Sequence, residues 1–262
     1  MTTIEKNYQI WNSEEHWEHG IFGDREPLLD GEKWSRPWGH SRYQWLITIL
    51  PRIYKNLPTK SILEIACGRG RWTQYLLPMS EMITLVELSE NNIEYCKKRF
   101  INFSNIKYIK NDGKSLDGVN DNCIDFVFSY DSLVHSDEET LESYIKEISR
   151  VLKNNGEAFI HSSNLAGIVD RDVKNNHMRD NTCSAEKVIK FATKYKLNCY
   201  LQELIPWDNY HIENKIYIDV YSFIAKTKNQ ASTKIIENET IKYERMVANW
   251  MYDNFKSNLQ KA

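Results

Sequence analysis

The segment 62–73 constrains the fold of this chain more than any other part of the sequence. It reads Ile-Leu-Glu-Ile-Ala-Cys-Gly-Arg-Gly-Arg-Trp-Thr, an apolar run that enters a glycine-bearing turn and continues into a helical pattern. Gly68 and Gly70 let the backbone approach a ligand closely, and the first turn of the following helix offers unpaired N–H groups. The segment therefore predicts a strand, a ligand-binding turn and a helix, the opening unit of a parallel α/β sheet.

The rest of the chain continues this alternation of short apolar runs with helical periodicity. We expect strands over 61–65, 82–87, 106–110, 124–129, 158–161, 197–205 and 215–226. Helices are expected from 72 to 77, over 90–102, over 141–152 with Gly156 as its terminating signal, and from Ser184 to about 196. This order predicts an α/β fold with a doubly wound, Rossmann-like, mostly parallel seven-stranded sheet.

The two ends of the chain differ from this alternating region. We predict a helical, aromatic N-terminal cap over 1–45, a cofactor-binding domain over 46–228 and a C-terminal amphipathic helix within 229–262. The cap carries the indoles of Trp11, Trp17, Trp34, Trp38 and Trp45. Most of them are expected to pack on the domain edge, with Trp38 as the exception that reaches the cofactor. The polar stretch 164–183 predicts a long loop, and loops of this length usually serve a function or are disordered.

Composition excludes several classes of protein. A formal net charge of -2 over 262 residues gives no general attraction to phosphate backbones, so no nucleic-acid partner is expected. No apolar stretch approaches the ~20 residues that span a bilayer, and no secretory signal is evident, so we expect a soluble, cytoplasmic protein without an integral membrane segment. Five cysteines without a C-x-x-C pair predict reduced thiols and no metal site. The composition leaves the oligomeric state undecided, and a homodimer is possible.

An acidic residue follows the second predicted strand at the spacing that a nucleoside cofactor requires. Glu87 comes nineteen residues after Gly68, where its carboxylate can accept hydrogen bonds from ribose hydroxyls. The dinucleotide fingerprint would place a third glycine at position 73, which is Thr73 here. The pattern therefore favours a nucleoside cofactor other than a nicotinamide or flavin dinucleotide.

The run Glu64-Ile-Ala-Cys-Gly-Arg-Gly70 resembles motif I of the class I S-adenosyl-L-methionine (SAM) dependent methyltransferases. Asn111-Asp-Gly113 resembles the family's adenine-contacting segment, and Ser129-Tyr-Asp131 resembles its motif at the methyl-transfer centre; Glu87 stands where members commonly carry Asp. The resemblance covers roughly residues 38–226 and implies SAM as cofactor. The cofactor contacts that we expect are Trp38, Glu64, Ala66, Gly68, Gly70, Trp72, Glu87, Leu88, Asn111, Asp112, Gly113 and Ser129.

A narrower resemblance concerns a bacterial subgroup found with capsule and lipopolysaccharide synthesis. It rests on the stretches 38–41, 62–72, 111–115 and 128–135. The resemblance implies methylation of sugars or of phosphate-type groups on glycan precursors. A small-molecule or glycan-precursor acceptor is therefore expected.

Three side chains at or just beyond strand ends are the candidates for catalysis, namely Asp131, His135 and His161. A sugar hydroxyl is a poor nucleophile near neutral pH, so a general base is worth roughly 10²- to 10⁴-fold. We expect His135 to be this base and Asp131 to orient it or to touch the methionine amino group of SAM. The alternative for His135 is that it caps the helix that follows.

Acceptor contacts are expected from Tyr130, His161, His177 and Arg179. His161 could equally be a structural histidine within its strand. The loop residues Arg171, Lys174, His177 and Arg179 could grip an anionic acceptor or could equally form a solvated loop face. A phosphate or phosphoramidate acceptor would already be anionic and would need no base, so the sequence leaves this alternative to sugar O-methylation open. A SAM-binding protein without activity is the further alternative.

Overall fold

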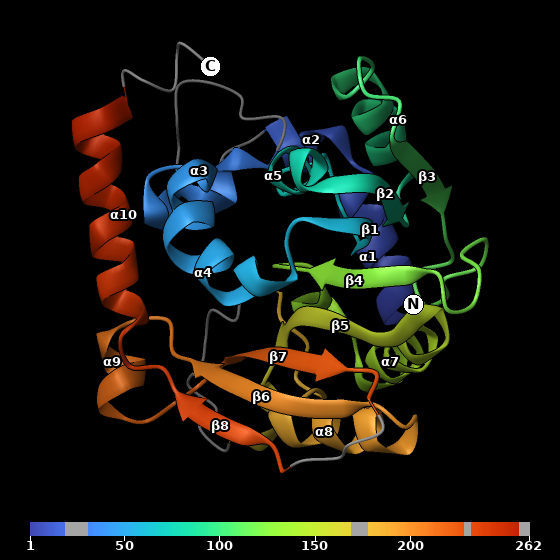
Figure 1. Cartoon of the computed structure of the whole chain (residues 1–262). Helices are drawn as coiled ribbons and strands as arrows, with labels where there is room; N and C mark the ends of the chain where they lie inside the picture. The colour runs from blue at the N-terminus through green and yellow to red at the C-terminus, as the bar shows by residue number, and fades with distance from the viewer. Residues whose placement is uncertain (19–30, 169–177, 228–231, 257–262) are drawn as a thin grey trace.

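The fold is a doubly wound α/β sandwich around one eight-stranded sheet, and the predicted fold class is confirmed (Figure 1). The computed structural model describes residues 1–18, 31–168, 178–227 and 232–256. The strands are β1 (Thr59–Ile65), β2 (Ser80–Glu87), β3 (Ile106–Lys110), β4 (Ile124–Ser129), β5 (Leu152–Ser163), β6 (Asn198–Ile205), β7 (Asp219–Ala225) and β8 (Lys234–Glu237). Their order in the sheet is β3-β2-β1-β4-β5-β7-β6-β8.

The sheet is mostly parallel, with one antiparallel strand. Strands β3, β2, β1, β4 and β5 pair in parallel, β7 pairs antiparallel with both β5 and β6, and β8 pairs in parallel with β6. The eighth strand is the one that the sequence did not predict. It is four residues long, lies at the sheet edge and leaves Ile235 54% exposed, so its sequence lacks the apolar run of a buried strand.

The helices are α1 (Thr3–Trp11), α2 (Glu14–Glu18), α3 (Ser41–Gln44), α4 (Leu50–Ile53), α5 (Thr73–Leu76), α6 (Glu90–Arg99), α7 (Glu138–Val151), α8 (Ala185–Lys194), α9 (Asn209–Glu213) and α10 (Ile241–Phe255). Short 3₁₀ turns lie at Glu32–Trp38, Tyr54–Asn56, Leu77–Met79, Leu133–His135 and Leu165–Gly167, and a π turn at Trp45–Ile49. None of the described helices is long and apolar enough to cross a membrane.

Alternating side chains of the central strands bury both faces of the sheet. On β1 and β4, Leu63 and Val127 face α7 and α8, whereas Ile62 and Phe126 face the helices α4 to α6. Because both faces are covered, these strands are apolar at successive positions. The central strands could be predicted from the sequence because both of their faces are buried.

The prediction that Gly156 ends a helix was wrong. The helix α7 ends at Val151, and Gly156 lies inside β5. A Cβ at this position would lie 3.0 to 3.1 Å from the carbonyl oxygens of Lys153, Ile124 and Asp125. Glycine is favoured here because three backbone carbonyl oxygens leave little room for a side chain.

Candidate active site

The turn between β1 and α5 has a backbone that favours glycine. Ala66, Gly68 and Gly70 have φ values of 56°, 56° and 83°, all in the left-handed region. A Cβ at Gly68 would lie 3.0 Å from the indole of Trp17, and a Cβ at Gly70 would lie 2.5 Å from the ring of Phe100. Gly68 faces the cavity described below, whereas Gly70 packs against the helix α6 side of the domain.

Glu87, the last residue of β2, braces this turn. Its carboxylate accepts hydrogen bonds from the backbone N–H of Gly68 at 2.8 Å and from that of Ser89 at 2.9 Å. Burial raises the pKa of Glu87, while these N–H groups oppose the shift. The carboxylate also lines the cavity, so it fixes the shape of the turn and faces the space beside it.

Glu64 is a brace too, but it lies outside the cavity. The hydroxyl of Thr73 donates to its carboxyl at 2.6 Å, which joins the end of β1 to the start of α5. Burial raises the pKa of Glu64 to about 8. Its contribution to the site is therefore the position of the turn.

A cavity of about 350 Å³ opens where the carboxyl ends of β1, β2 and β4 meet. This volume suits a small ligand, and this edge is where open α/β sheets bind ligands. Of the expected cofactor contacts, those that line it are Ala66, Gly68, Trp72, Glu87, Leu88, Asn111 and Gly113. Tyr130, Asp131, His135 and Arg179 line it as well.

The N-terminal cap forms one wall of this cavity, contrary to the expectation for its indoles. Trp11, Trp17 and Trp34 line the cavity and pack edge to face, with ring centroids 5.0 to 6.0 Å apart. Trp38 and Trp45 are the two indoles of the cap that do not line it, and Trp45 lies in the core beneath the sheet's helices. Trp38 packs elsewhere. Its Nε1 donates to Thr48 Oγ1 at 3.0 Å, and its ring packs against Ala248 of α10.

Two further cofactor expectations lie outside the cavity lining. Asp112 is exposed, and its Oδ1 accepts from the backbone N–H groups of Lys114 and Ser115 at 3.0 and 2.7 Å, so it shapes the loop after β3. Ser129 is fully buried and donates to the carbonyl of Ile65 at 3.1 Å. Both side chains are engaged in holding backbone segments.

His135 has the geometry of a neutral base. Its Nδ1 lies 3.0 Å from the carbonyl oxygen of Met178, which can only accept, so Nδ1 carries the proton and Nε2 has the lone pair. Burial lowers the pKa of His135 to about 4. Capping of α7 falls to Asp137, whose carboxylate accepts from the N–H of Thr140 at 2.9 Å. The capping alternative for His135 is therefore wrong.

Asp131 is paired with an arginine of the glycine turn. Arg71 Nη2 lies 2.7 Å from Asp131 Oδ2, and the guanidinium stacks over Trp72 with its carbon 4.6 Å from the ring centroid. Burial by itself would raise the pKa of Asp131, but the charges of Arg71, His161 and Arg179 together with the Arg71 hydrogen bond outweigh it, and the pKa is lowered. Met178 positions the ring of His135, and Asp131 instead holds Arg71.

Behind Asp131 lies a buried polar chain. His161 Nδ1 accepts from the backbone N–H of Asp131 at 3.1 Å, and its Nε2 lies 3.3 Å from Asp219. Arg179 pairs with both oxygens of Asp219 at 2.7 and 2.9 Å and stacks over Trp207. His161 is thus behind the cavity wall, while Arg179 is part of the wall and is buried rather than solvated.

Tyr130 lines the cavity, and its hydroxyl lies 2.7 Å from that of Tyr221. His177, together with Arg171 and Lys174 of the same predicted loop, falls outside the described residues. The lining residues that the sequence reasoning missed include Asn7, Arg69, Arg71, Ser132, Met178 and Trp207. The two arginines sit inside the glycine motif and were detectable there, whereas Met178 and Trp207 carry no local signal.

The comparisons with known proteins agree with this geometry. Residues 62–156 match the family model described as a methyltransferase domain, a span that contains the turn, Glu87 and His135. The match indicates a SAM-dependent methyltransferase. SAM is the cofactor that it indicates. No curated protein matches the sequence.

Solved structures share the fold at low sequence identity. The N-methyltransferase NodS from Bradyrhizobium japonicum WM9, in complex with S-adenosyl-l-homocysteine, is 14% identical with a TM-score of 0.57, over 86% of this chain and 98% of that one. Geranyl diphosphate C-methyltransferase from Streptomyces coelicolor A3(2) is 16% identical with a TM-score of 0.60, over 86% and 97%. A SAM-dependent methyltransferase from Clostridium acetobutylicum ATCC 824 is 16% identical with a TM-score of 0.54, over 72% and 91%.

Proposed function

We propose that this protein transfers a methyl group from SAM to a hydroxyl of a small, glycan-type acceptor, such as a nucleotide sugar or a capsule or lipopolysaccharide precursor. The proposal is carried by the state and position of His135. Its imidazole is neutral with the lone pair on Nε2, and the residue lies in the wall of the cavity. A hydroxyl acceptor needs such a base, and an anionic oxygen does not.

The residues around the glycine turn fit SAM. Glu87 is placed to accept hydrogen bonds from ribose hydroxyls, and Leu88 and Gly113 form an apolar wall beside it. A Cβ at Gly113 would lie 3.0 Å from Ile4 and 3.4 Å from Leu88, so the glycine keeps this space narrow but open. The shared fold with NodS, solved with S-adenosyl-l-homocysteine, supports the assignment.

When bound, SAM supplies a methyl group on a sulfonium sulfur, and the sulfur leaves as the neutral thioether of S-adenosylhomocysteine. The chain's own contribution is to align the acceptor oxygen with that group and to take its proton. His135 Nε2 accepts the proton, and the Met178 carbonyl keeps the ring in the orientation and tautomer that this requires.

The charge of the cavity wall favours a hydroxyl over a phosphate as the acceptor group. Three arginines of the described chain line the cavity, and each is paired with a carboxylate: Arg69 with Glu14, Arg71 with Asp131, and Arg179 with Asp219. An anionic acceptor would have to compete with these carboxylates for the guanidinium groups. A neutral hydroxyl leaves the ion pairs in place.

The test measures binding and turnover separately. Calorimetric titration with SAM and with S-adenosylhomocysteine should show binding, and nucleotide sugars and phosphorylated glycans should then be screened as acceptors. His135→Ala should keep its SAM affinity and lose roughly 10²- to 10⁴-fold in kcat on a hydroxyl acceptor. His211→Ala, which removes a histidine of α9 outside the cavity lining, is the matched control.

Each outcome separates the alternatives. Full turnover of His135→Ala on a phosphate or phosphoramidate acceptor would replace the hydroxyl proposal with O-methylation of an anionic group. SAM binding without turnover on any acceptor of the screen would favour a non-catalytic SAM-binding protein.

The pH dependence provides a second check on His135. Burial lowers the pKa of His135 to about 4, so the base stays unprotonated well below the ordinary histidine range near 6.5. The acid limb of kcat should therefore fall near pH 4 to 5 and not near 6.5. A limb at the ordinary value would contradict the assignment of His135 as base.

A further inference from the structure

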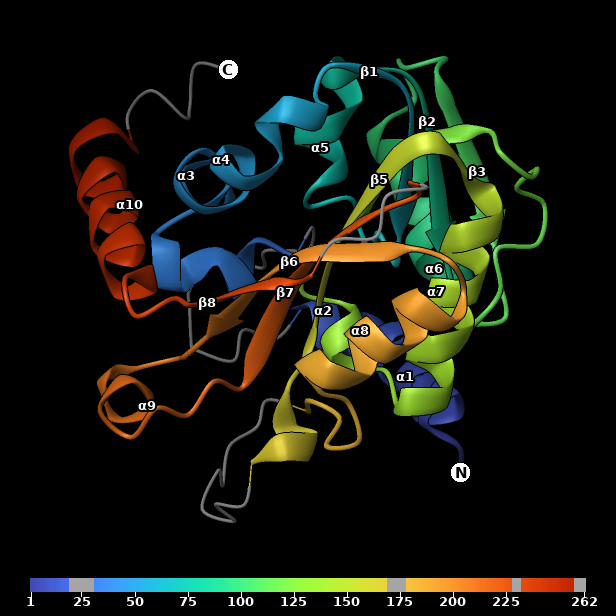
Figure 2. The same ribbon diagram turned by 60° about the horizontal axis from the view of Figure 1, so that its bottom comes forward.

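The C-terminal helix α10 presents a row of apolar side chains to solvent. Tyr243, Met246, Val247 and Trp250 are 54%, 63%, 47% and 59% exposed. Their spacing of three, four and seven residues places them on one side of the helix, and we refer to these four residues as the α10 stripe. In Figures 1 and 2 the helix lies at the periphery of the molecule, beside α3. Contiguous apolar patches on a soluble protein mark interaction sites.

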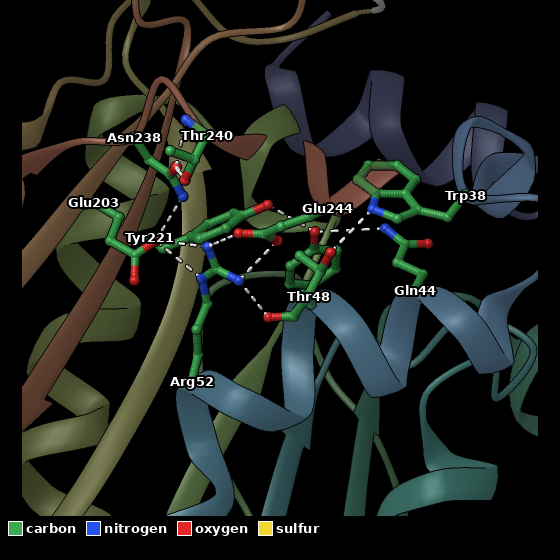
Figure 3. A network of polar contacts seen from close by, with 10 residues as sticks. Trp38, Gln44, Thr48, Arg52, Glu203, Tyr221, Asn238, Thr240 and Glu244 are labelled. Atoms are coloured by element: carbon green, nitrogen blue, oxygen red, sulfur yellow. Dashed lines mark hydrogen bonds and ion pairs between the residues drawn. The ribbon is translucent and has the colours of Figure 1, made fainter. Parts of the chain in front are cut away.

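The opposite side of α10 is firmly attached to the domain. Arg52 of α4 pairs with Glu244 of α10 and with Glu203 of β6, each at 2.8 Å (Figure 3). Asn249 donates to the carbonyl of Pro37 at 2.7 Å, and Ala248 is fully buried. The helix therefore has a fixed orientation, which presents the stripe outward as a rigid surface.

Two charged residues border the stripe on one side. Lys242 and Asp253 are eleven residues apart, about three turns of helix, so they lie on nearly the same flank. In the described part of the chain neither of them has an ion-pair partner; Lys242 contacts only the ring of Tyr243, with its Nζ 5.2 Å from the centroid. The flank is positive near the start of the helix and negative near its end.

We propose that α10 is a homodimer interface, in which the stripes of two copies pack antiparallel about a two-fold axis. An antiparallel arrangement places the first turn of one helix beside the last turn of the other. Lys242 of each copy then faces Asp253 of the second copy, and the stripe packs on itself with the two-fold axis close to Val247. Because the stripe and its charged flank are complementary to themselves, we infer that the binding partner of α10 is a second copy of this chain.

The interface reaches the active-site cavity through the inner side of the same helix. Asn249 and Arg245 donate to the carbonyl groups of Pro37 and Trp207, and both of these residues line the cavity. Dimerisation would thus fix the position of α10, the helix that is hydrogen-bonded to two parts of the cavity wall. The dimer itself does not depend on the proposed reaction.

Sedimentation velocity of the full chain over a concentration series tests the proposal. The wild-type protein should sediment as a dimer. Met246→Glu and Trp250→Glu should each raise the dimer dissociation constant at least about tenfold, because each buries an unpaired charge in the interface. Circular dichroism should show that both variants stay folded, since the side chains are exposed in the monomer. Tyr210→Glu, an exposed position on α9 outside the stripe, should leave the dimer unchanged.

Charge reversal tests the antiparallel arrangement. Lys242→Glu and Asp253→Lys should each weaken the dimer, and the double variant should restore it. Failure of the double variant to restore a dimer that both single variants weaken would overturn the two-fold antiparallel packing.

Three results would overturn the interface itself. These are a wild-type protein that stays monomeric at every concentration, a dimer insensitive to Trp250→Glu, and a monomer whose stripe instead binds vesicles of phosphatidylglycerol and phosphatidylcholine in a Trp250-dependent way.

Discussion

The two walls of the candidate active-site cavity are built in different ways. The wall around the glycine turn consists of residues at or just after the ends of β1, β2 and β3, such as Gly68, Glu87 and Gly113. The facing wall combines Trp11 and Trp34 of the N-terminal segment with His135 and Arg179, which are far apart in the chain. The first wall is encoded locally by a strand and its turn, while the second exists only after the chain has folded. The difference suggests that cofactor binding and acceptor binding can be disturbed separately.

The largest effect on SAM affinity is expected from a bulky side chain placed in the wall around the glycine turn. Gly68→Arg should weaken SAM binding at least about 1000-fold, or about 4 kcal/mol, measured by calorimetry. The reason is that φ is 56° and the Cβ would already lie 3.0 Å from Trp17. Gly118→Arg is the matched control, since φ is 85° there but the Cβ would meet Ile109 at an ordinary 3.6 Å outside the cavity. Equal loss of binding in both variants would mean that backbone strain, and not the cavity, is responsible.

A smaller effect, on the pH dependence of stability, is expected from Glu64, the buried carboxyl that holds the glycine turn in position. Glu64, with its pKa raised by burial to about 8, stays protonated in the folded protein between pH 4.5 and 8, where the unfolded chain is ionised. The folded state therefore binds more protons, and the free energy of unfolding falls as the pH rises through this window.

In the wild type the free energy of unfolding should fall by about 3 kcal/mol between pH 5 and 8, as measured by urea unfolding. Glu64→Gln should abolish this decrease. Glu90→Gln, which changes a carboxyl that is half exposed, should leave the pH dependence as it is in the wild type. A pH dependence that survives in Glu64→Gln would assign the effect to another buried group.

The smallest effect is expected at the ion pair that joins the two walls. Arg71→Met leaves the carboxylate of Asp131 without its partner at 2.7 Å, and turnover should fall roughly 10- to 100-fold while SAM affinity changes little. Arg150→Met, at an arginine that pairs with Glu147 and Asp121 away from the cavity, is the control.

The double variant Arg71→Met/Asp131→Asn separates function from structure. Removing both charges should restore the thermal stability that Arg71→Met loses, but not the turnover. Recovery of turnover in the double variant would show that the pair acts only on folding, and the two walls would then be functionally independent.

The sequence by itself determined seven of the strands and most of the wall around the glycine turn. Strands buried on both faces carry apolar residues at successive positions, and the turn after β1 favours glycine because its φ values are positive, so both leave a local signature. Glu87 was found from its spacing to Gly68, and the structure joins the two by a hydrogen bond of 2.8 Å.

Only the tertiary structure decided the facing wall. An indole has the same sequence signature whether it lines a cavity or fills a core, so Trp38 was expected at the cofactor, whereas Trp11, Trp17 and Trp34 line the cavity. His135 is positioned by the carbonyl of Met178, forty-three residues away, and no residue pattern encodes that contact. Long-range packing sets these positions because a side chain's surroundings depend on segments that meet only in the folded chain.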